Sequence, residues 1–79
     1  MGNVDRYIET LIKEGGYRQS DVARAIGVPR QLLSYVIAGR RELSMPLALK
    51  LESYFNLPEG KLLKMQVEDS IQIYKQQLR

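Results

Sequence analysis

The hydrophobic residues of this chain recur at the spacing of helices. Near the N-terminus they follow steps of three, one, three and one, which places side chains on one face of a helix. These residues are Val4, Tyr7, Ile8, Leu11 and Ile12. Near the C-terminus an apolar stripe follows steps of four, four, three and four, through Leu63, Val67, Ile71, Tyr74 and Leu78. No run of four or more residues alternates as a half-buried strand does, so the pattern predicts an all-α fold.

Glycine, proline and serine mark where the helices begin and end. Gly15 and Gly16 end the first helix, and Gly27 ends the second, because glycine accepts left-handed backbone geometry. Pro29 opens the third, because its missing N–H costs nothing in a first helical turn. Ser44 is a suitable N-cap for the fourth. We therefore expect five helices, over residues 4–14, 19–26, 29–38, 45–55 and 58–79.

The length sets the domain organisation. A chain of 79 residues is at most one small domain. We expect a single domain over 1–79, with a core bundle at 4–63 and an extended C-terminal helix at 64–79. The apolar stripe of this last helix either packs on the bundle or forms a dimer or partner surface, and the pattern favours packing on the bundle.

The composition excludes several classes of protein. The chain has no Cys and no His, so it lacks the commonest ligands for zinc and the usual general base near neutral pH. We expect no enzyme, no metal site and no cofactor. The apolar runs are far shorter than the roughly 20 residues that span a bilayer. We expect a cytoplasmic protein that does not contact membranes.

The basic residues are concentrated in one segment. The net charge of the whole chain is +3, but residues 18–41 hold five arginines and one acid, net +4, so that the rest sums to −1. Such a concentration indicates an anionic partner more strongly than the total charge does.

The same segment has the spacing of a helix-turn-helix motif, two short helices joined by a turn at Gly27. Ala23 is small enough for the two helices to approach closely, and Leu33 and Val36 can pack back under the first helix. Val22, Ile26 and Val28 complete the apolar cluster. An ordinary helical bundle with two helices joined at a glycine is the alternative.

These residues resemble the DNA-binding domain of the Cro and lambda-repressor family, also called the Xre family. The resemblance covers 4–63 and rests on Gln19, Val22, Ala23, Ile26, Gly27, Val28, Leu33, Val36, Gly39 and Arg40. It implies a five-helix lambda-repressor-like fold, in which a homodimeric transcriptional repressor binds double-stranded DNA at a pseudo-palindromic operator. The segment 58–75 is also similar to the tail of HigA-type antitoxins, which bind a toxin partner and repress their own toxin-antitoxin operon. Two alternatives are a stand-alone phage or mobile-element regulator and a fold used only for protein–protein interaction.

The resemblance also implies which residues contact DNA, because in this family the third helix enters the major groove. Arg30 can pair with guanine and Gln31 with adenine, while Ser34 and Tyr35 follow one turn later. We expect the exposed face of this helix to hold Arg30, Gln31, Leu32, Ser34, Tyr35 and Ile37.

Four further residues are expected at the phosphate backbone. Gln19 lies in the first turn of the second helix, where the family's glutamine binds a phosphate near the positive end of the helix dipole. Arg40 and Arg41 match a basic pair that follows the third helix, and Arg18 can join them. Ordinary solvated side chains are the alternative for all four.

The sequence departs from the family pattern at three helix starts. Arg18, Pro29 and Leu57 stand where Thr or Ser usually precedes a helix. Because a missing N-cap costs about 1 kcal/mol, we expect looser helix ends at these places.

Overall fold

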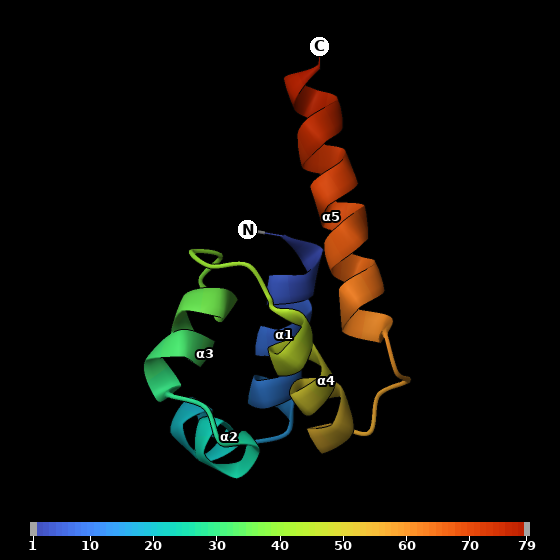
Figure 1. Cartoon of the computed structure of the whole chain (residues 1–79). Helices are drawn as coiled ribbons and strands as arrows, with labels where there is room; N and C mark the ends of the chain where they lie inside the picture. The colour runs from blue at the N-terminus through green and yellow to red at the C-terminus, as the bar shows by residue number, and fades with distance from the viewer. Residues whose placement is uncertain (1, 79) are drawn as a thin grey trace.

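The computed structural model describes residues 2–78 and contains five helices. They are α1 (Asn3–Glu14), α2 (Gln19–Ile26), α3 (Arg30–Ile37), α4 (Met45–Tyr54) and α5 (Lys61–Gln77). No strand occurs within the described part, and the predicted all-α fold of five helices is confirmed (Figure 1). Residues 1 and 79, the two ends of the predicted single domain, lie outside the described residues.

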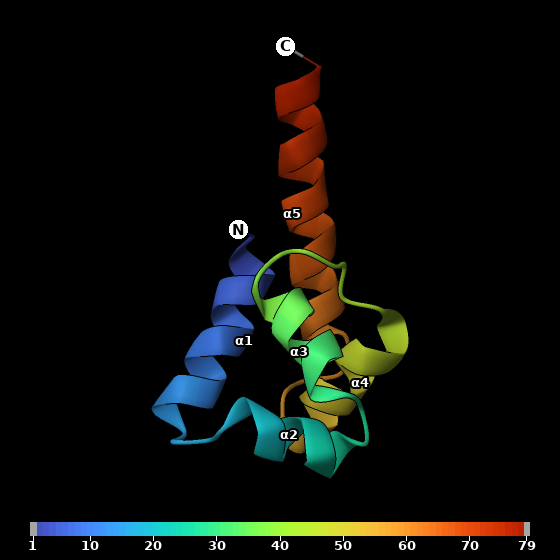
Figure 2. The ribbon, with the colours of Figure 1, turned by 90° about the vertical axis from the view of Figure 1, so that its left-hand side faces the viewer.

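The first four helices and the start of α5 surround one hydrophobic core. α1 packs against α3 and α5, while α2 packs against α3 and α4. The core is made of aliphatic side chains from all five helices and from the loop before α4: Val4, Ile8, Ile12, Val22, Ala23, Leu33, Val36, Ile37, Leu43, Leu47, Ala48, Leu51 and Leu62. The arrangement places α2 and α3 at one corner of the bundle, as the two perpendicular views show (Figures 1 and 2).

Four of the helices end in the same turn, in which one residue adopts a left-handed conformation and two N–H groups bond back into the last turn. At the end of α2 this residue is Gly27, with φ of 73°. The Gly27 N–H donates to Arg24 O, and the Val28 N–H donates to Ala23 O at 2.9 Å. The corresponding residues of α1, α3 and α4 are Gly16, Gly39 and Asn56. These turns explain why the helix ends predicted from glycine are nearly correct.

The helix starts agree less well with the prediction. Ser44 accepts a hydrogen bond from the Leu47 N–H, as an N-cap does. Arg18 and Pro29 precede α2 and α3 without a side-chain cap, as expected. The prediction that a helix starts after Leu57 is wrong, because the chain turns through Gly60, with φ of 88°, before α5 begins.

A carboxylate from another helix caps α5. The side chain of Glu52 on α4 is buried, and its two oxygens accept hydrogen bonds from the Gly60 and Leu62 N–H groups, each at 2.8 Å. A negative charge at this position also suits the helix dipole. The cap is thus supplied across the fold rather than by the preceding residue.

The second half of α5 leaves the bundle. Figures 1 and 2 both show it extending beyond the other helices, and the molecule measures 42 × 24 × 22 Å. Leu63 packs against the core, but the rest of the predicted stripe is exposed, from Val67 to Leu78. The expectation that this stripe packs on the bundle is therefore wrong beyond Leu63, because the second half of α5 runs past the other helices.

Candidate nucleic-acid interface

The interface is built on the contact between α2 and α3. Ala23 is 1% exposed and lets α3 approach closely, while Leu33 and Val36 are completely buried beneath α2. Ile26 and Val28 are half-buried and pack against the same cluster. The spacing of these residues predicted this packing, which holds α3 with one face in the core and the other in solvent.

The outer face of α3 carries most of the side chains that were predicted to contact bases. Arg30, Gln31 and Tyr35 are exposed, and Ser34 is half-buried beside them. The Gln31 Nε2 donates a hydrogen bond to the Tyr35 hydroxyl at 2.8 Å. An amide has two N–H donors and one oxygen acceptor, so Gln31 keeps a free donor and its acceptor, which are the two groups that a bidentate adenine contact needs.

Two residues of α3 are less accessible than predicted. Ile37 is buried in the core, and Leu32 is half-buried against it. Ile37 lies four residues after Leu33, one helical turn further along the same face, so it points inward with Leu33. The expectation that Ile37 is exposed is wrong, and that of an exposed Leu32 is only partly met.

The residues predicted at the phosphate backbone flank α3 on both sides. Arg18 is exposed immediately before α2, and Gln19 is half-buried in its first turn. Arg40 and Arg41 are exposed in the loop that follows Gly39. The side chains of these residues are therefore available to a ligand at both ends of the α2–α3 unit.

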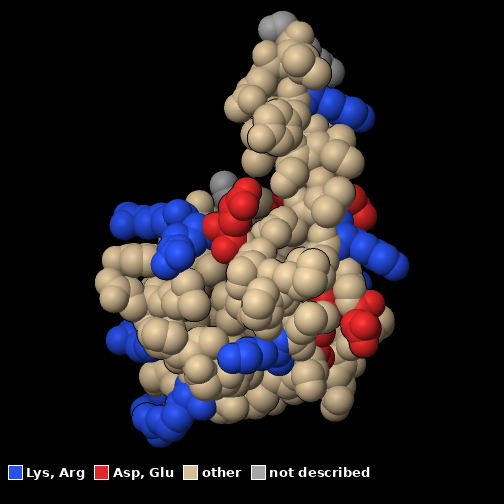
Figure 3. Space-filling model, viewed as in Figure 1, with Lys and Arg blue, Asp and Glu red and all other residues tan. Residues whose placement is uncertain are grey.

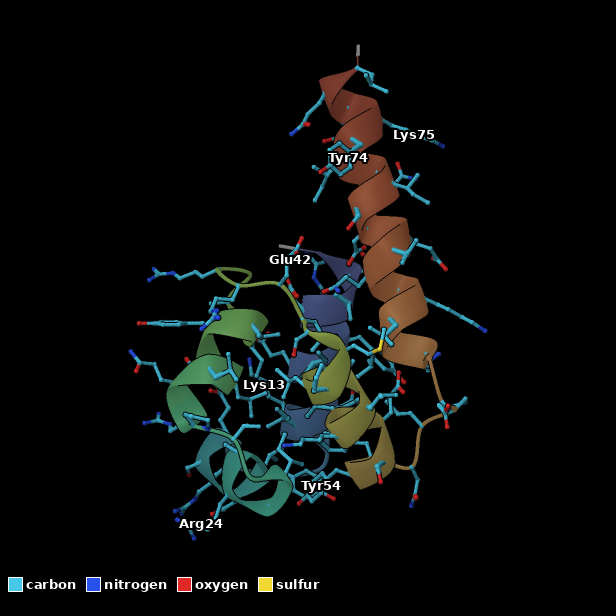
Figure 4. The ribbon with its side chains drawn as sticks, viewed as in Figure 1. Lys13, Arg24, Glu42, Tyr54, Tyr74 and Lys75 are labelled. Atoms are coloured by element: carbon cyan, nitrogen blue, oxygen red, sulfur yellow. The ribbon has the colours of Figure 1, made fainter. Side chains whose placement is uncertain are left out.

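The electrostatics of this side of the molecule are strongly positive. All five arginines of residues 18–41 are exposed, and none forms an ion pair within the described residues 2–78. Viewed as in Figure 1, basic side chains follow the left edge beside α2, α3 and the loop after α3, where the acidic Glu42 lies next to them; the other visible acidic groups lie near α5 (Figures 3 and 4). Arg24, which was not among the predicted contacts, also points outward from α2 (Figure 4).

One residue that supports the interface was not found by sequence reasoning. Gln66 on α5 holds the loop after α3 through both polar groups of its amide: its Oε1 accepts from the Leu43 N–H at 2.8 Å, and its Nε2 donates to Leu43 O at 2.7 Å. These bonds fix the chain just after Arg40 and Arg41. The partners are 23 residues apart, and no local pattern in the sequence signals the contact.

A second tie joins α5 to α1. The Asp69 Oδ2 accepts a hydrogen bond from the Val4 N–H at 2.9 Å, so it caps the start of α1. Nearby, burial raises the pKa of the Asp5 carboxyl; a hydrogen bond from the Gly2 backbone opposes this shift, and the negative charge of Asp69 adds to it. The start of α1 is thus held against α5 by Asp69, with a second carboxylate close by.

Metal-ligand clusters and membrane-spanning helices are both absent from residues 2–78. No group of three or more His, Cys, Asp or Glu side chains in this part of the chain is arranged to hold a metal ion. None of its helices has the length and apolarity that crossing a membrane requires.

Comparison with known proteins agrees with the geometry. A family model described as helix-turn-helix matches residues 8–62, which run from the middle of α1 through α2, α3 and α4 to the start of α5. No curated protein and no solved structure shows significant similarity to the chain. On this match, the chain belongs to the helix-turn-helix family of the Xre and lambda-repressor type, whose members are DNA-binding transcription regulators.

Proposed function

We propose that the protein is a transcriptional repressor that binds a pseudo-palindromic operator as a homodimer, with α3 in the major groove. The observation that carries this proposal is the exposed polar face of α3, flanked on both sides by arginines without ion pairs. A single short helix contacts only a few base pairs, so tight specific binding requires two such helices about 34 Å apart on the DNA.

The residues of α3 have distinct roles in this proposal. Arg30 at the first position of the helix pairs with guanine, and Gln31 pairs with adenine. Tyr35 orients the Gln31 amide through its hydroxyl group and lies against the edge of the groove. Ser34 is half-buried and makes a smaller contact on the same face.

The remaining site residues bind the DNA backbone. Arg40 and Arg41 contact phosphates on one side of α3, while Arg18 and Gln19 contact them near the N-terminus of α2. Such contacts set the position of the protein on the duplex and are independent of base sequence. A fold used only for protein–protein interaction is disfavoured, because five exposed arginines without ion pairs favour a strongly anionic partner such as DNA.

A salt titration of DNA affinity tests the proposal. The logarithm of the binding constant should fall steeply with the logarithm of the salt concentration, by about 0.9 for each phosphate neutralised.

Arg41→Ala should weaken binding to all sequences and reduce this slope by about 1, whereas Arg30→Ala should cost about 1–3 kcal/mol on the operator and relax its preference at one position. Lys64→Ala, on exposed α5, is the matched control and should change neither. A flat salt response, or identical effects of the two arginine variants on every sequence, contradicts the proposal.

A finer form of the proposal is an antitoxin of the HigA type that represses its own operon and binds a toxin. The similarity of residues 58–75 to the tail of those antitoxins supports it. A stand-alone phage or mobile-element regulator is the alternative, and it requires no toxin. A small basic open reading frame next to this one, whose product co-purifies with the protein, supports the antitoxin; an isolated gene supports the alternative.

A further inference from the structure

Gln31 and Tyr35 form a hydrogen-bonded pair on the outer face of α3. They are four residues apart, so their side chains are neighbours on consecutive turns of the helix. The Gln31 Nε2 donates to the Tyr35 hydroxyl at 2.8 Å, and neither side chain has another hydrogen-bond partner within residues 2–78. Both side chains are exposed. A ligand that approaches this face therefore meets the pair as one unit.

The direction of this hydrogen bond decides what the amide offers to a base. A hydroxyl group can donate or accept, and an amide has two N–H donors and one oxygen acceptor. In the structure the hydroxyl accepts, so one N–H of Gln31 is used and the other N–H remains free beside Oε1. If the hydroxyl donated to Oε1 instead, the acceptor would be used and both N–H groups would remain free.

The two directions match different purines. In the major groove adenine offers the N7 acceptor and the N6 donor, whereas guanine offers two acceptors, N7 and O6. One donor beside one acceptor pairs with adenine, and the amide oxygen then meets the O6 of guanine as a second acceptor. Two free donors suit guanine instead. Adenine recognition thus requires that the Tyr35 hydroxyl accept from Gln31 rather than donate to it.

The phosphate backbone is the group that can fix this direction. Tyr35 lies in the last turn of α3, and its carbonyl oxygen accepts a hydrogen bond from the Arg40 N–H at 2.9 Å. Arg40 and Arg41, which are exposed and form no ion pair within residues 2–78, are the residues proposed to contact phosphates. Phosphate oxygens in DNA only accept hydrogen bonds, and tyrosine is among the side chains that donate to them. A Tyr35 hydroxyl whose proton goes to a phosphate can only accept from Gln31.

We propose that the Tyr35 hydroxyl donates to a phosphate oxygen of the DNA and thereby fixes the Gln31 amide to select adenine over guanine. Tyr35 is a positioning residue in this scheme, because it acts on the base through Gln31. The inference rests on the proposed function, in which α3 lies in the major groove, and adds a coupling between a backbone contact and the choice of a base. Arg30 is independent of this coupling, because a guanidinium group has donors only and cannot change direction.

The size of the effect follows from the hydrogen bonds involved. One bidentate base contact discriminates between bases by about 5- to 150-fold. One ordinary hydrogen bond corresponds to about 2- to 12-fold. Removal of the Tyr35 hydroxyl should therefore weaken the choice between adenine and guanine by about 2- to 12-fold.

Duplexes that the wild-type protein selects from random DNA provide the probe for a test. The base preference that is lost in Gln31→Ala identifies the base pair that Gln31 contacts, and adenine and guanine are then compared there in otherwise identical duplexes. Tyr35→Phe keeps the ring and removes only the hydroxyl group. It should lower the adenine-to-guanine ratio of binding constants by about 2- to 12-fold and leave the preference at the Arg30 base pair unchanged. In the Gln31→Ala background the same change should not alter base preference.

Tyr54→Phe is the matched control. Tyr54 is 36% exposed, as Tyr35 is, and it lies on α4 outside the proposed interface. This variant should bind the selected duplexes like the wild type, and far-UV circular dichroism should show that both phenylalanine variants are folded. An unchanged adenine-to-guanine ratio in Tyr35→Phe, or an equal loss of affinity on every sequence, overturns the proposal, because the hydroxyl then does not direct Gln31.

Neutral methylphosphonate groups, placed one at a time along the selected duplex, test the contact to the backbone. At one position the adenine-to-guanine ratio of the wild type should fall about as far as in Tyr35→Phe, and Tyr35→Phe itself should not respond there. The absence of any such position overturns the coupling. A wild type that selects no DNA sequence contradicts the proposed function. Selection of a sequence at which Gln31→Ala loses no preference for adenine contradicts only this inference.

Discussion

The amide of Gln66 links the loop after α3 to α5, and its removal is a direct test of the structure. In Gln66→Ala, the N–H and C=O of Leu43 lose both of their partners, although Leu43 itself is only 2% exposed. Two hydrogen bonds contribute about 1 kcal/mol each, and backbone groups left without partners add to the cost where water cannot reach them. We expect a loss of about 2–3 kcal/mol, from a total stability of about 4–12 kcal/mol for a chain of this length.

Urea unfolding followed by far-UV circular dichroism measures this loss. With a slope of about 1 kcal/mol/M for a small protein, the midpoint should fall by about 2–3 M. Gln72→Ala removes the same side chain from an exposed site on the same helix and should change the midpoint little. Gln66→Met fills a similar volume without hydrogen bonds, so it should be nearly as unstable as Gln66→Ala.

Two outcomes refute this reasoning. If Gln66→Ala loses less than about 0.5 kcal/mol, like an ordinary surface substitution, the two hydrogen bonds do not anchor the loop. If Gln66→Met restores full stability, the side chain acts through packing. Where the loop is anchored as described, folded Gln66→Ala should also bind all DNA sequences more weakly, because Arg40 and Arg41 are no longer held in place.

Three further predictions concern stability. Glu52→Ala removes the acceptor for the Gly60 and Leu62 N–H groups, so it should lower the free energy of unfolding by about 3 kcal/mol. Amide hydrogen exchange should increase first in the opening turn of α5. A uniform increase across the chain would contradict the capping role. Gly27→Ala should lower the free energy of unfolding by about 1–2 kcal/mol in thermal unfolding, because alanine is strained at a φ of 73°. No larger loss is expected, because no atom lies within 4 Å of an added Cβ. A loss above about 4 kcal/mol would indicate a clash. The raised pKa of Asp5 means that folding disfavours its charged form, so its contribution to stability falls as pH rises above the ordinary value of 3.8. Relative to the wild type, Asp5→Asn should therefore gain stability between about pH 3 and pH 7, and a constant difference would refute the shift.

Local patterns were sufficient for the helices and the motif. Ala23 is small, Gly27 can adopt a positive φ, and Leu33 has the spacing of a core residue. The structure shows Ala23 and Leu33 buried and Gly27 with a positive φ, as these properties predicted. The outward positions of Arg30 and Gln31 follow from the same periodicity. These features depend on residues that lie close together in the sequence, between Ala23 and Leu33, so the sequence alone determined them.

The predictions were less accurate at the ends of elements. Ile37, in the last turn of α3, was expected to be exposed, although its spacing of four residues from Leu33 places it on the buried face of the helix. The start of α5 was placed too early at Pro58, because the carboxylate that caps it comes from Glu52 on another helix.

Only the tertiary structure decided what α5 does. In the sequence, Leu63 and Ile71 belong to one uninterrupted stripe, and nothing local separates a core residue from an exposed one. Only the first part of α5 lies against the other helices, so the stripe is half-buried at Leu63 and exposed from Val67 onward. Burial depends on what lies opposite a side chain, and that is set by the lengths and packing of all five helices together.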